Sequence, residues 1–264
     1  QVWWPHFDRP QYTVTKPPEW DGEQQSYVDP ATGHALWTWD DAIAAAAKAV
    51  AAAARVTILA SATLSNDTLF VLSRIGAHVG AALSVTVPRS TEAPLTGVPD
   101  LALRAERVPN HTGAEIFGFA ESHSPTTSLA AGELVLIVGD ALDALDLPDG
   151  VHAIVMGSVM PETVRSAVLA ALPICTLAEE DGTFTNLRGR VQRFMQAKSP
   201  PALTRPSYAV AASLARAVGA GAFPATASEI FGAVASSVPA FACMSYRTLG
   251  LKGVPAAMPE GVPA

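Results

Sequence analysis

The stretch LAEEDGTFTNLRGRVQRFMQA, residues 177–197, carries its charges in separate blocks. Three acidic residues open it, GTFTN follows at 182–186, and three arginines come next. Gly182 and Gly189 can adopt a positive φ that other residues avoid, and Asn186 tolerates the same region. Because the second half shows no helical apolar stripe, we predict an irregular, largely buried loop with acid and base at its two ends. The alternative is a surface hairpin whose charges are solvated.

The residues around this stretch alternate short apolar runs with helical patterns, which is typical of a parallel sheet covered by helices. We expect strands at 56–60, 83–87, 133–138 and 151–156, with an edge strand at 171–175 that Pro173 interrupts. We expect helices at 38–54, 65–79, 206–219 and 226–238, a further helix starting near Met160, and mostly loop over 88–132. The predicted fold class is therefore α/β, a Rossmann-like parallel sheet flanked by helices.

The chain divides into three parts by composition. Residues 1–36 are rich in proline and aromatic residues, so we expect an extended arm whose rings need a surface to lie on. The α/β domain is expected over 37–200. Residues 201–264 are expected to form C-terminal helices and a tail that pack on that domain.

The bulk composition excludes several classes of function. The net charge of −7 disfavours nucleic acid as a partner, and no apolar run is long enough for a direct membrane span. Cys175 and Cys243 lack the spacing for an iron–sulfur cluster or a zinc site, so we expect isolated buried thiols. His111 and His123 form the one plausible ligand pair, but no third ligand is in register, and we expect no metal.

Several segments resemble a known family. EEDGTFTNLRGRVQRF resembles the corresponding stretch of molybdopterin-type oxidoreductases, with the closest likeness to the G subunits of respiratory NADH-quinone oxidoreductases (complex I). TWDDAIAAAAKAV, residues 38–50, resembles the helix that opens the cofactor-binding domain in these enzymes, and RAERVPNHTGAEIFGF, residues 104–119, resembles a segment of the G subunits. Together these patches cover most of the chain, although large stretches of the family pattern are missing.

The resemblance implies a reduced molybdopterin-oxidoreductase-type domain that is a non-catalytic structural subunit or domain of a complex I-like electron-transfer complex. The metal-binding residue and the four-cysteine motif of active members are not recognisable, so we expect no catalytic residues and no cofactor in this chain. Iron–sulfur clusters are expected in an adjoining segment or in partner subunits. The implied partners are the other subunits of a multi-subunit redox complex, and the implied location is cytoplasmic, peripheral to the inner membrane through that complex.

The charged stretch would then serve structure or an interface. We expect its arginines to pair with its acids, either inside the loop or across an interface between subunits. Such pairs are worth roughly 0–1 kcal/mol at a surface, whereas a buried pair makes removal of one partner costly. The structural or interface residues expected here are Glu179, Glu180, Asp181, Asn186, Arg188, Arg190 and Arg193.

Two other functions remain open. The first is a molybdopterin-binding oxidoreductase subunit, similar to formate dehydrogenase, that holds the pterin nucleotide at the carboxyl ends of the strands. Its cofactor-binding residues would be Ser61, Thr63, Asp140 and Ser158. Asp140 could equally cap a short turn at 141–145. The second is an independent Rossmann-like module for a nucleotide or another small ligand, although the chain has no GxGxxG or Walker loop.

Overall fold

The computed structural model describes residues 19–21, 26–28, 35–36, 38–90, 92–103, 105–122, 126–139, 145–160, 162–201 and 204–257. The N-terminal arm therefore falls mostly outside the described residues. The parts of it that are described form a small antiparallel sheet of three strands, β1 (Glu19–Asp21), β2 (Ser26–Val28) and β3 (Ala35–Leu36).

A six-stranded parallel sheet forms the centre of the molecule, in the order β11-β10-β9-β4-β5-β8. The four predicted strands are confirmed within two residues as β4 (Val56–Ser61), β5 (Ala82–Thr86), β9 (Leu134–Val138) and β10 (His152–Gly157). The edge strands are β8 (Ala120–Glu121) and β11 (Val168–Pro173), so the expected edge position of the Pro173 strand is also confirmed. Every residue of β4 and β9 is buried, which explains why these strands read as continuous apolar runs.

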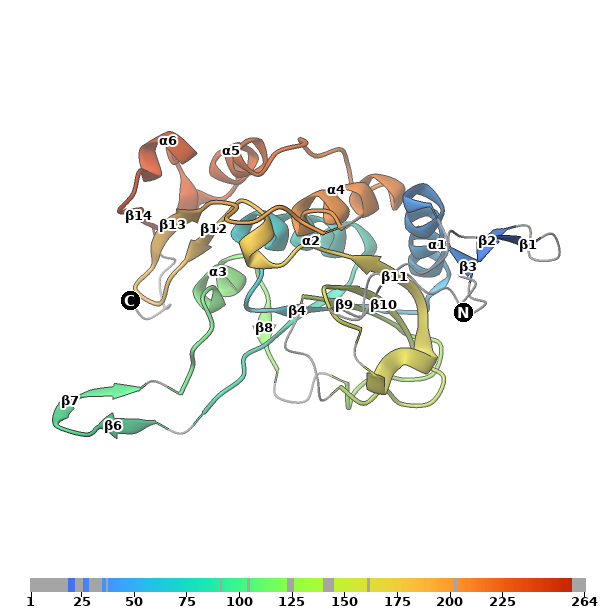
Figure 1. Ribbon diagram of the computed structural model, residues 1–264, viewed down its shortest axis with the longest axis horizontal. Helices are drawn as coiled ribbons and strands as arrows, with labels where there is room; N and C mark the ends of the chain where they lie inside the picture. Colours follow the sequence, from blue (N-terminus) through green and yellow to red (C-terminus); the bar gives the residue numbers. More distant parts are fainter. Residues whose placement is uncertain are drawn as a thin grey trace.

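The long helices begin where the sequence places their caps. They are α1 (Trp39–Ala52), α2 (Asn66–Val79), α4 (Ser207–Ala217) and α5 (Ala227–Ser237). Thr38, Ser65 and Thr226 each accept a hydrogen bond from a backbone N–H in the first turn of the helix that follows. Helix α4 packs against both α1 and α2 (Figure 1). Among the described residues, no helix combines the length and apolar composition needed to cross a membrane.

The region predicted as mostly loop contains regular structure. Strands β6 (Ala93–Leu95) and β7 (Val98–Leu103) form a hairpin that projects from the sheet (Figure 1), and α3 (His111–Ile116) follows it. Two prolines in the hairpin hid its strand pattern, while Gly97 at φ +84° makes its turn. The helix expected from Met160 is only the 3₁₀ helix η1 (Glu162–Ala167).

The charged stretch at 177–197 contains a hairpin, so the predicted irregular loop is wrong. After the 3₁₀ helix η2 (Leu177–Glu179), β12 (Gly182–Thr185) pairs antiparallel with β13 (Arg190–Phe194), which also pairs with β14 (Val254–Pro255). Asn186 Oδ1 accepts hydrogen bonds from the backbone N–H groups of Arg188 and Arg190, both at 3.0 Å, and Gly189 has φ +68°. The surface-hairpin alternative has the right topology, but three of the four β12 residues are buried. The remaining short elements are η3 (Pro239–Phe241) and α6 (Tyr246–Leu249).

Candidate functional site

The carboxyl ends of β4, β9 and β10 lie at one edge of the sheet, where open α/β folds bind their ligands. Ser61 ends β4 and Thr63 follows in the next loop, and their hydroxyl oxygens are hydrogen-bonded to each other at 2.8 Å. Ser61 and Ser158 are both buried, whereas Asp140 lies outside the described residues. A Cβ on Gly139 would lie 2.8 Å from the Cβ of Ser61. The described loops at this edge therefore pack directly on each other.

The β12–β13 hairpin packs on the first turn of α2. Oδ2 of Asp67, in the first turn of α2, accepts hydrogen bonds from the backbone N–H of Thr183 at 2.8 Å and from its hydroxyl at 3.0 Å. A Cβ on Gly182 would lie 2.6 Å from the ring of Phe194 and 2.8 Å from the Cβ of Ser65. The glycine thus allows the hairpin backbone to come this close to the helix.

A second buried connection joins the hairpin to the loop before α3. Asn110 Oδ1 accepts a hydrogen bond from the backbone N–H of Thr185 at 2.8 Å, and its Nδ2 donates to the carbonyl of Leu64 at 2.7 Å. The hydroxyl of Thr185 donates to Asn66 Oδ1 at 3.3 Å. Gly113 lies beside both amides, and a Cβ there would overlap the Oδ1 atoms of Asn110 and Asn66. This position therefore requires glycine.

Glu180 connects the hairpin to α4. Its carboxylate accepts hydrogen bonds from the backbone N–H of Ser207 at 2.6 Å and from the Ser207 hydroxyl at 2.8 Å. The Ser207 hydroxyl also lies 2.7 Å from the hydroxyl of Thr68 in α2. The hydrogen bond between Thr68 and Ser207 thus joins the first turns of α2 and α4 directly.

Burial raises the pKa of two carboxyl groups and two tyrosines around the hairpin. Loss of hydration raises the pKa of Asp67 to about 7, although its hydrogen bonds to Thr183 act in the opposite direction. Burial also raises the pKa of Glu180 to about 8, and the charges of Asp67 and Asp181 add to the rise. Burial and the same acids raise the pKa of Tyr208 to about 12 and that of Tyr246 well above its usual range. The second Asp67 oxygen has no hydrogen-bond partner, so its ionised form is poorly stabilised.

The other two acids of the stretch have separate partners. Oε1 of Glu179 lies 3.8 Å from the Lys198 ammonium, and Oε2 accepts a hydrogen bond from the Thr176 backbone N–H at 3.0 Å. Asp181 is exposed and accepts a hydrogen bond from the backbone N–H of Gln196 at 2.8 Å.

The predicted pairing of these acids with the arginines does not occur within the described part of the chain. Arg190 instead donates a hydrogen bond to the carbonyl of Gly253 at 2.9 Å. Arg188 is exposed in the hairpin turn. Arg193 lies opposite Thr183 on the neighbouring strand, and its buried Nε has no hydrogen-bond partner. Pairing across an interface with another subunit stays a prediction.

The candidate metal ligands do not form a metal site among the described residues, in which no group of three or more could hold an ion. His111 lies 3.5–3.9 Å from Glu106, Glu115 and Glu121, and Glu121 also forms an ion pair with Arg89. His123 falls outside the described residues. Cys175 is a buried thiol, as expected, but Cys243 is exposed.

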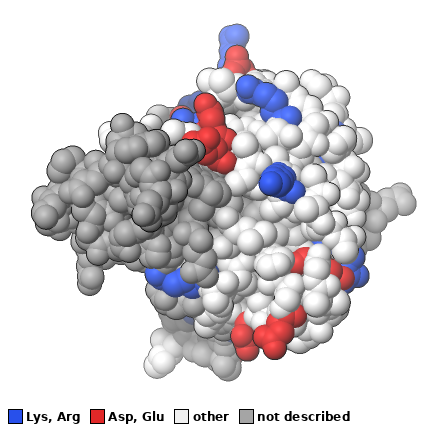
Figure 2. Space-filling view, turned by 90° about the vertical axis from the view of Figure 1, so that its right-hand side faces the viewer, with Lys and Arg blue, Asp and Glu red and all other residues white. Residues whose placement is uncertain are grey.

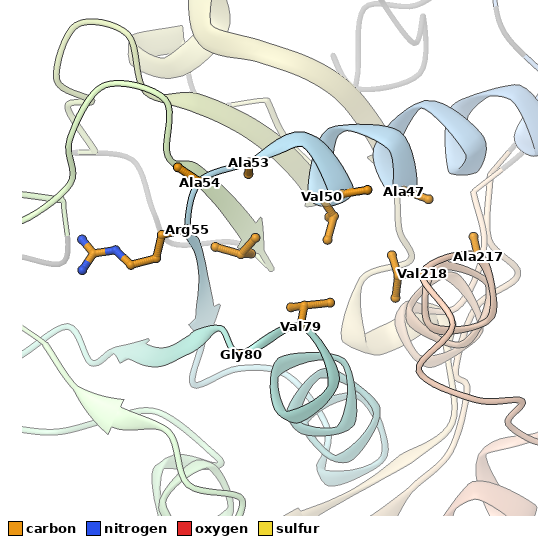
Figure 3. A pocket seen from close by; sticks show the side chains of 11 residues that line it. Ala47, Val50, Ala53, Ala54, Arg55, Val79, Gly80, Ala217 and Val218 are labelled. Atoms are coloured by element: carbon orange, nitrogen blue, oxygen red, sulfur yellow. The ribbon is translucent and has the colours of Figure 1, made fainter.

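A hollow of about 420 Å³ lies at the opposite edge of the sheet, where β4 begins. Figure 3 shows it between the last turns of α1, α2 and α4, with apolar side chains around it. Its lining residues are Ala47, Val50, Ala51, Ala53, Ala54, Arg55, Val56, Val79, Gly80, Ala217 and Val218. Ser61, Thr63 and Ser158, the described residues predicted to bind a cofactor, do not line it.

The family match on this chain includes the hairpin. Residues 153–217 match the molybdopterin oxidoreductase family. The chain is 38% identical over 128 residues to the alpha subunit of F420-dependent formate dehydrogenase 2 of Methanococcus maripaludis, covering 47% of this chain and 18% of that protein. It is 30% identical over 131 residues to the G subunit of NADH-quinone oxidoreductase of Streptomyces coelicolor, covering 46% of this chain and 14% of that protein.

A third relative is the putative formate dehydrogenase YrhE of Bacillus subtilis, 29% identical over 121 residues, with 46% of this chain and 12% of that protein covered. The chain is therefore related to molybdopterin oxidoreductases, both to formate dehydrogenases and to the complex I G subunit. It matches less than a fifth of the length of each of these relatives.

Sequence reasoning missed the residues that form hydrogen bonds with the hairpin. Asp67 and Asn110 lie 116 and 75 positions from Thr183 and Thr185, respectively, so no local spacing connects them. The available signal was the polar run Ser65-Asn66-Asp67-Thr68 between a buried strand and an apolar helix. All four of these polar residues are buried, which implies that some other segment must satisfy them.

Proposed function

We propose that this chain is a structural, cofactor-free domain of a multi-subunit oxidoreductase complex, similar in role to a part of the G subunit of NADH-quinone oxidoreductase. The observation that carries the proposal is the buried contact between the β12–β13 hairpin and the first turn of α2. Asp67 and Asn110 direct their oxygens to backbone N–H groups of the hairpin. One oxygen of each side chain is thus used within the chain, whereas Asp67 Oδ1 and Asn66 Nδ2 are buried without a hydrogen-bond partner.

The described members of the predicted cofactor set do not fit a pterin nucleotide as they stand. Ser61 is 2% exposed and bonded to Thr63, and Ser158 is 7% exposed. Close backbone approach of a phosphate is also not available at Gly139, because Ser61 and Leu64 occupy the space beside its Cα. Iron–sulfur clusters would then lie in an adjoining segment or in partner subunits, and the complex would be peripheral to the inner membrane.

A molybdopterin-binding role is the second candidate, and the relatives favour it specifically. The matches at 38% and 33% identity are both alpha subunits of formate dehydrogenases. In this case Ser61, Thr63, Asp140 and Ser158 would hold the pterin nucleotide, and the loops that carry them would have to separate from their present contacts.

Isolation of the complex from its source, through an affinity tag on this chain, tests the proposal. We expect other subunits to co-purify, including polypeptides with iron–sulfur clusters, with molybdenum and tungsten far below one equivalent per chain. Molybdenum or tungsten near one equivalent that stays with this chain after the subunits are separated would favour the second candidate. A chain that purifies alone would overturn the structural role.

A further inference from the structure

The small sheet β12–β13–β14 differs in charge from the rest of the molecule. Residues 182–195 and 241–257, which contain its strands and the neighbouring turns, include five basic residues and no acidic residue. The whole chain has a net charge of −7, so the remainder is more acidic than the total suggests. Figure 1 shows this sheet at the end of the molecule opposite α1.

Hydrogen bonds bring the basic residues of two segments together. The Arg190 guanidinium donates to the Gly253 carbonyl at 2.9 Å, and the backbone N–H of Ala256 donates to the Gly189 carbonyl at 2.8 Å. The Arg190 side chain thus reaches the loop before β14, which lies beside Val191 and Gln192, while the hairpin turn lies beside Ala256. We call this surface the basic end, which consists of Leu187, Arg188, Arg190, Leu251 and Lys252.

The basic end combines unpaired charge with exposed apolar side chains. Leu251 is 94% exposed and Leu187 is 38% exposed. Within the described chain, neither Arg188 nor Lys252 makes an ion pair. Elsewhere on the surface, Arg55 and Arg89 are each paired with a glutamate, at 2.8 Å and 2.7 Å, whereas Lys48 and Arg216 make no ion pair within the described chain.

The end of the molecule that carries α1 has a different charge pattern. Figure 2 looks onto that end and shows both basic and acidic side chains on a mostly uncharged surface, where grey does not cover it. Residues 182–195 and 241–257 instead combine five basic residues and no acidic residue with the highly exposed Leu251. Interfaces often place apolar contacts at the centre and charges around them, where the charges guide association.

We propose that the basic end is a docking surface for an acidic face of a neighbouring protein subunit. Leu187 and Leu251 would provide the apolar contacts, and Arg188 and Lys252 would meet carboxylates of that subunit. This inference rests on the proposed role in a multi-subunit complex and identifies the contact surface. A folded acidic subunit fits better than nucleic acid, because the overall charge of −7 repels a polyanion beyond the contact area.

Lysine acetylation of the complex isolated from its source, compared with the separated chain, tests the docking surface. Lys48 on α1 is also exposed and serves as the internal control. We expect assembly to reduce the labelling of Lys252 about tenfold, as burial under a subunit requires, while Lys48 labelling stays the same. Equal labelling of Lys252 in the complex and in the separated chain would overturn the docking surface.

A charge-reversal pair tests the chemistry of the contact. The variant Arg188→Glu with Lys252→Glu is expected to weaken partner binding about tenfold at moderate salt, because rim charges govern association. The matched control, Lys48→Glu with Arg216→Glu, makes the same charge change at exposed sites on α1 and α4 and should bind as the natural chain does. Equal weakening by both variants would refute a specific acidic contact. If no subunit co-purifies with the natural chain, the proposed function fails together with this inference; if subunits co-purify but neither test responds, only the docking surface fails.

Discussion

The two ends of the parallel sheet are built in opposite ways. At the carboxyl end, buried polar side chains bind the backbone of a hairpin more than 70 residues away in sequence. At the amino end, alanine and valine side chains line a hollow of about 420 Å³ that holds no buried polar cluster among its described lining residues. The hollow and the buried polar side chains therefore lie at opposite ends of the sheet. At the carboxyl end, the described loops and the hairpin pack on one another.

The largest expected difference between the two ends is in their response to pH. Asp67 and Glu180 have folded-state pKa values raised to about 7 and about 8, above their unfolded values. The stability that these two side chains contribute when protonated is thus complete below their unfolded pKa values. It is lost as the pH rises through their folded-state pKa values. We expect the free energy of unfolding to fall by roughly 6 kcal/mol between about pH 5 and pH 8. Urea denaturation followed by circular dichroism measures this.

Two variants assign that pH dependence to the carboxyl end. Asp67→Asn and Glu180→Gln should each remove about half of the slope, while Asp149→Asn, at an exposed turn, should leave it unchanged. A stability that rises steadily over the same pH range would show that the two buried carboxyl groups are not protonated in the folded state.

The next effect concerns glycines. Gly113→Ala should reduce stability by about 3 kcal/mol, because its Cβ would overlap two buried amide oxygens and displace the acceptor of the Thr185 N–H. The control is Gly232→Ala in α5, where no atom lies near the new Cβ and the helix should gain about 0.5–1 kcal/mol. Thermal unfolding distinguishes the two, and an equal response to both substitutions would contradict the tight contact.

A smaller effect isolates one side-chain bond of the hairpin. Thr183→Val keeps the shape of the side chain but removes the hydroxyl that donates to Asp67 at 3.0 Å, so we expect a loss of about 1–2 kcal/mol. Thr183→Ser keeps the hydroxyl and should lose less. If the Thr183→Val variant is as stable as the natural chain at about pH 6, this hydrogen bond contributes nothing to holding the hairpin.

The smallest effect is expected at the amino end. Val79→Ile adds one methyl group beside the hollow and should change stability by less than about 1 kcal/mol, in the stabilising direction. Val71→Ile on the same helix adds the same group where Val71 is completely buried, and it should be destabilising by about 1–3 kcal/mol. A large loss of stability in the Val79→Ile variant would mean that the hollow has no room for the added methyl group.

The parts of the fold that local patterns encode were predictable. The strands around Ile58 and Leu136 are apolar runs, and the helix caps at Thr38 and Ser65 follow from side chains that accept backbone hydrogen bonds. The hairpin β6–β7 was missed because Pro94 and Pro99 interrupt its pattern.

The site itself was less predictable, because its contacts join distant segments. The charges of Glu180 and Arg190 suggested mutual pairing, but Glu180 binds Ser207 and Arg190 binds a backbone carbonyl. Asn186 was the exception, since its role in the turn is local and follows from its residue type. Whether Asp140 caps a turn or faces a ligand lies outside the described residues.

The most direct test asks whether a cofactor is bound at the carboxyl end of the sheet. It is native mass spectrometry of this chain, isolated from its source and separated gently from its partners. We predict the mass of the polypeptide alone and no fluorescent pterin after oxidation of the sample. A mass increased by a pterin nucleotide, with matching fluorescence, would contradict the account and show that the hairpin and a cofactor share this edge of the sheet.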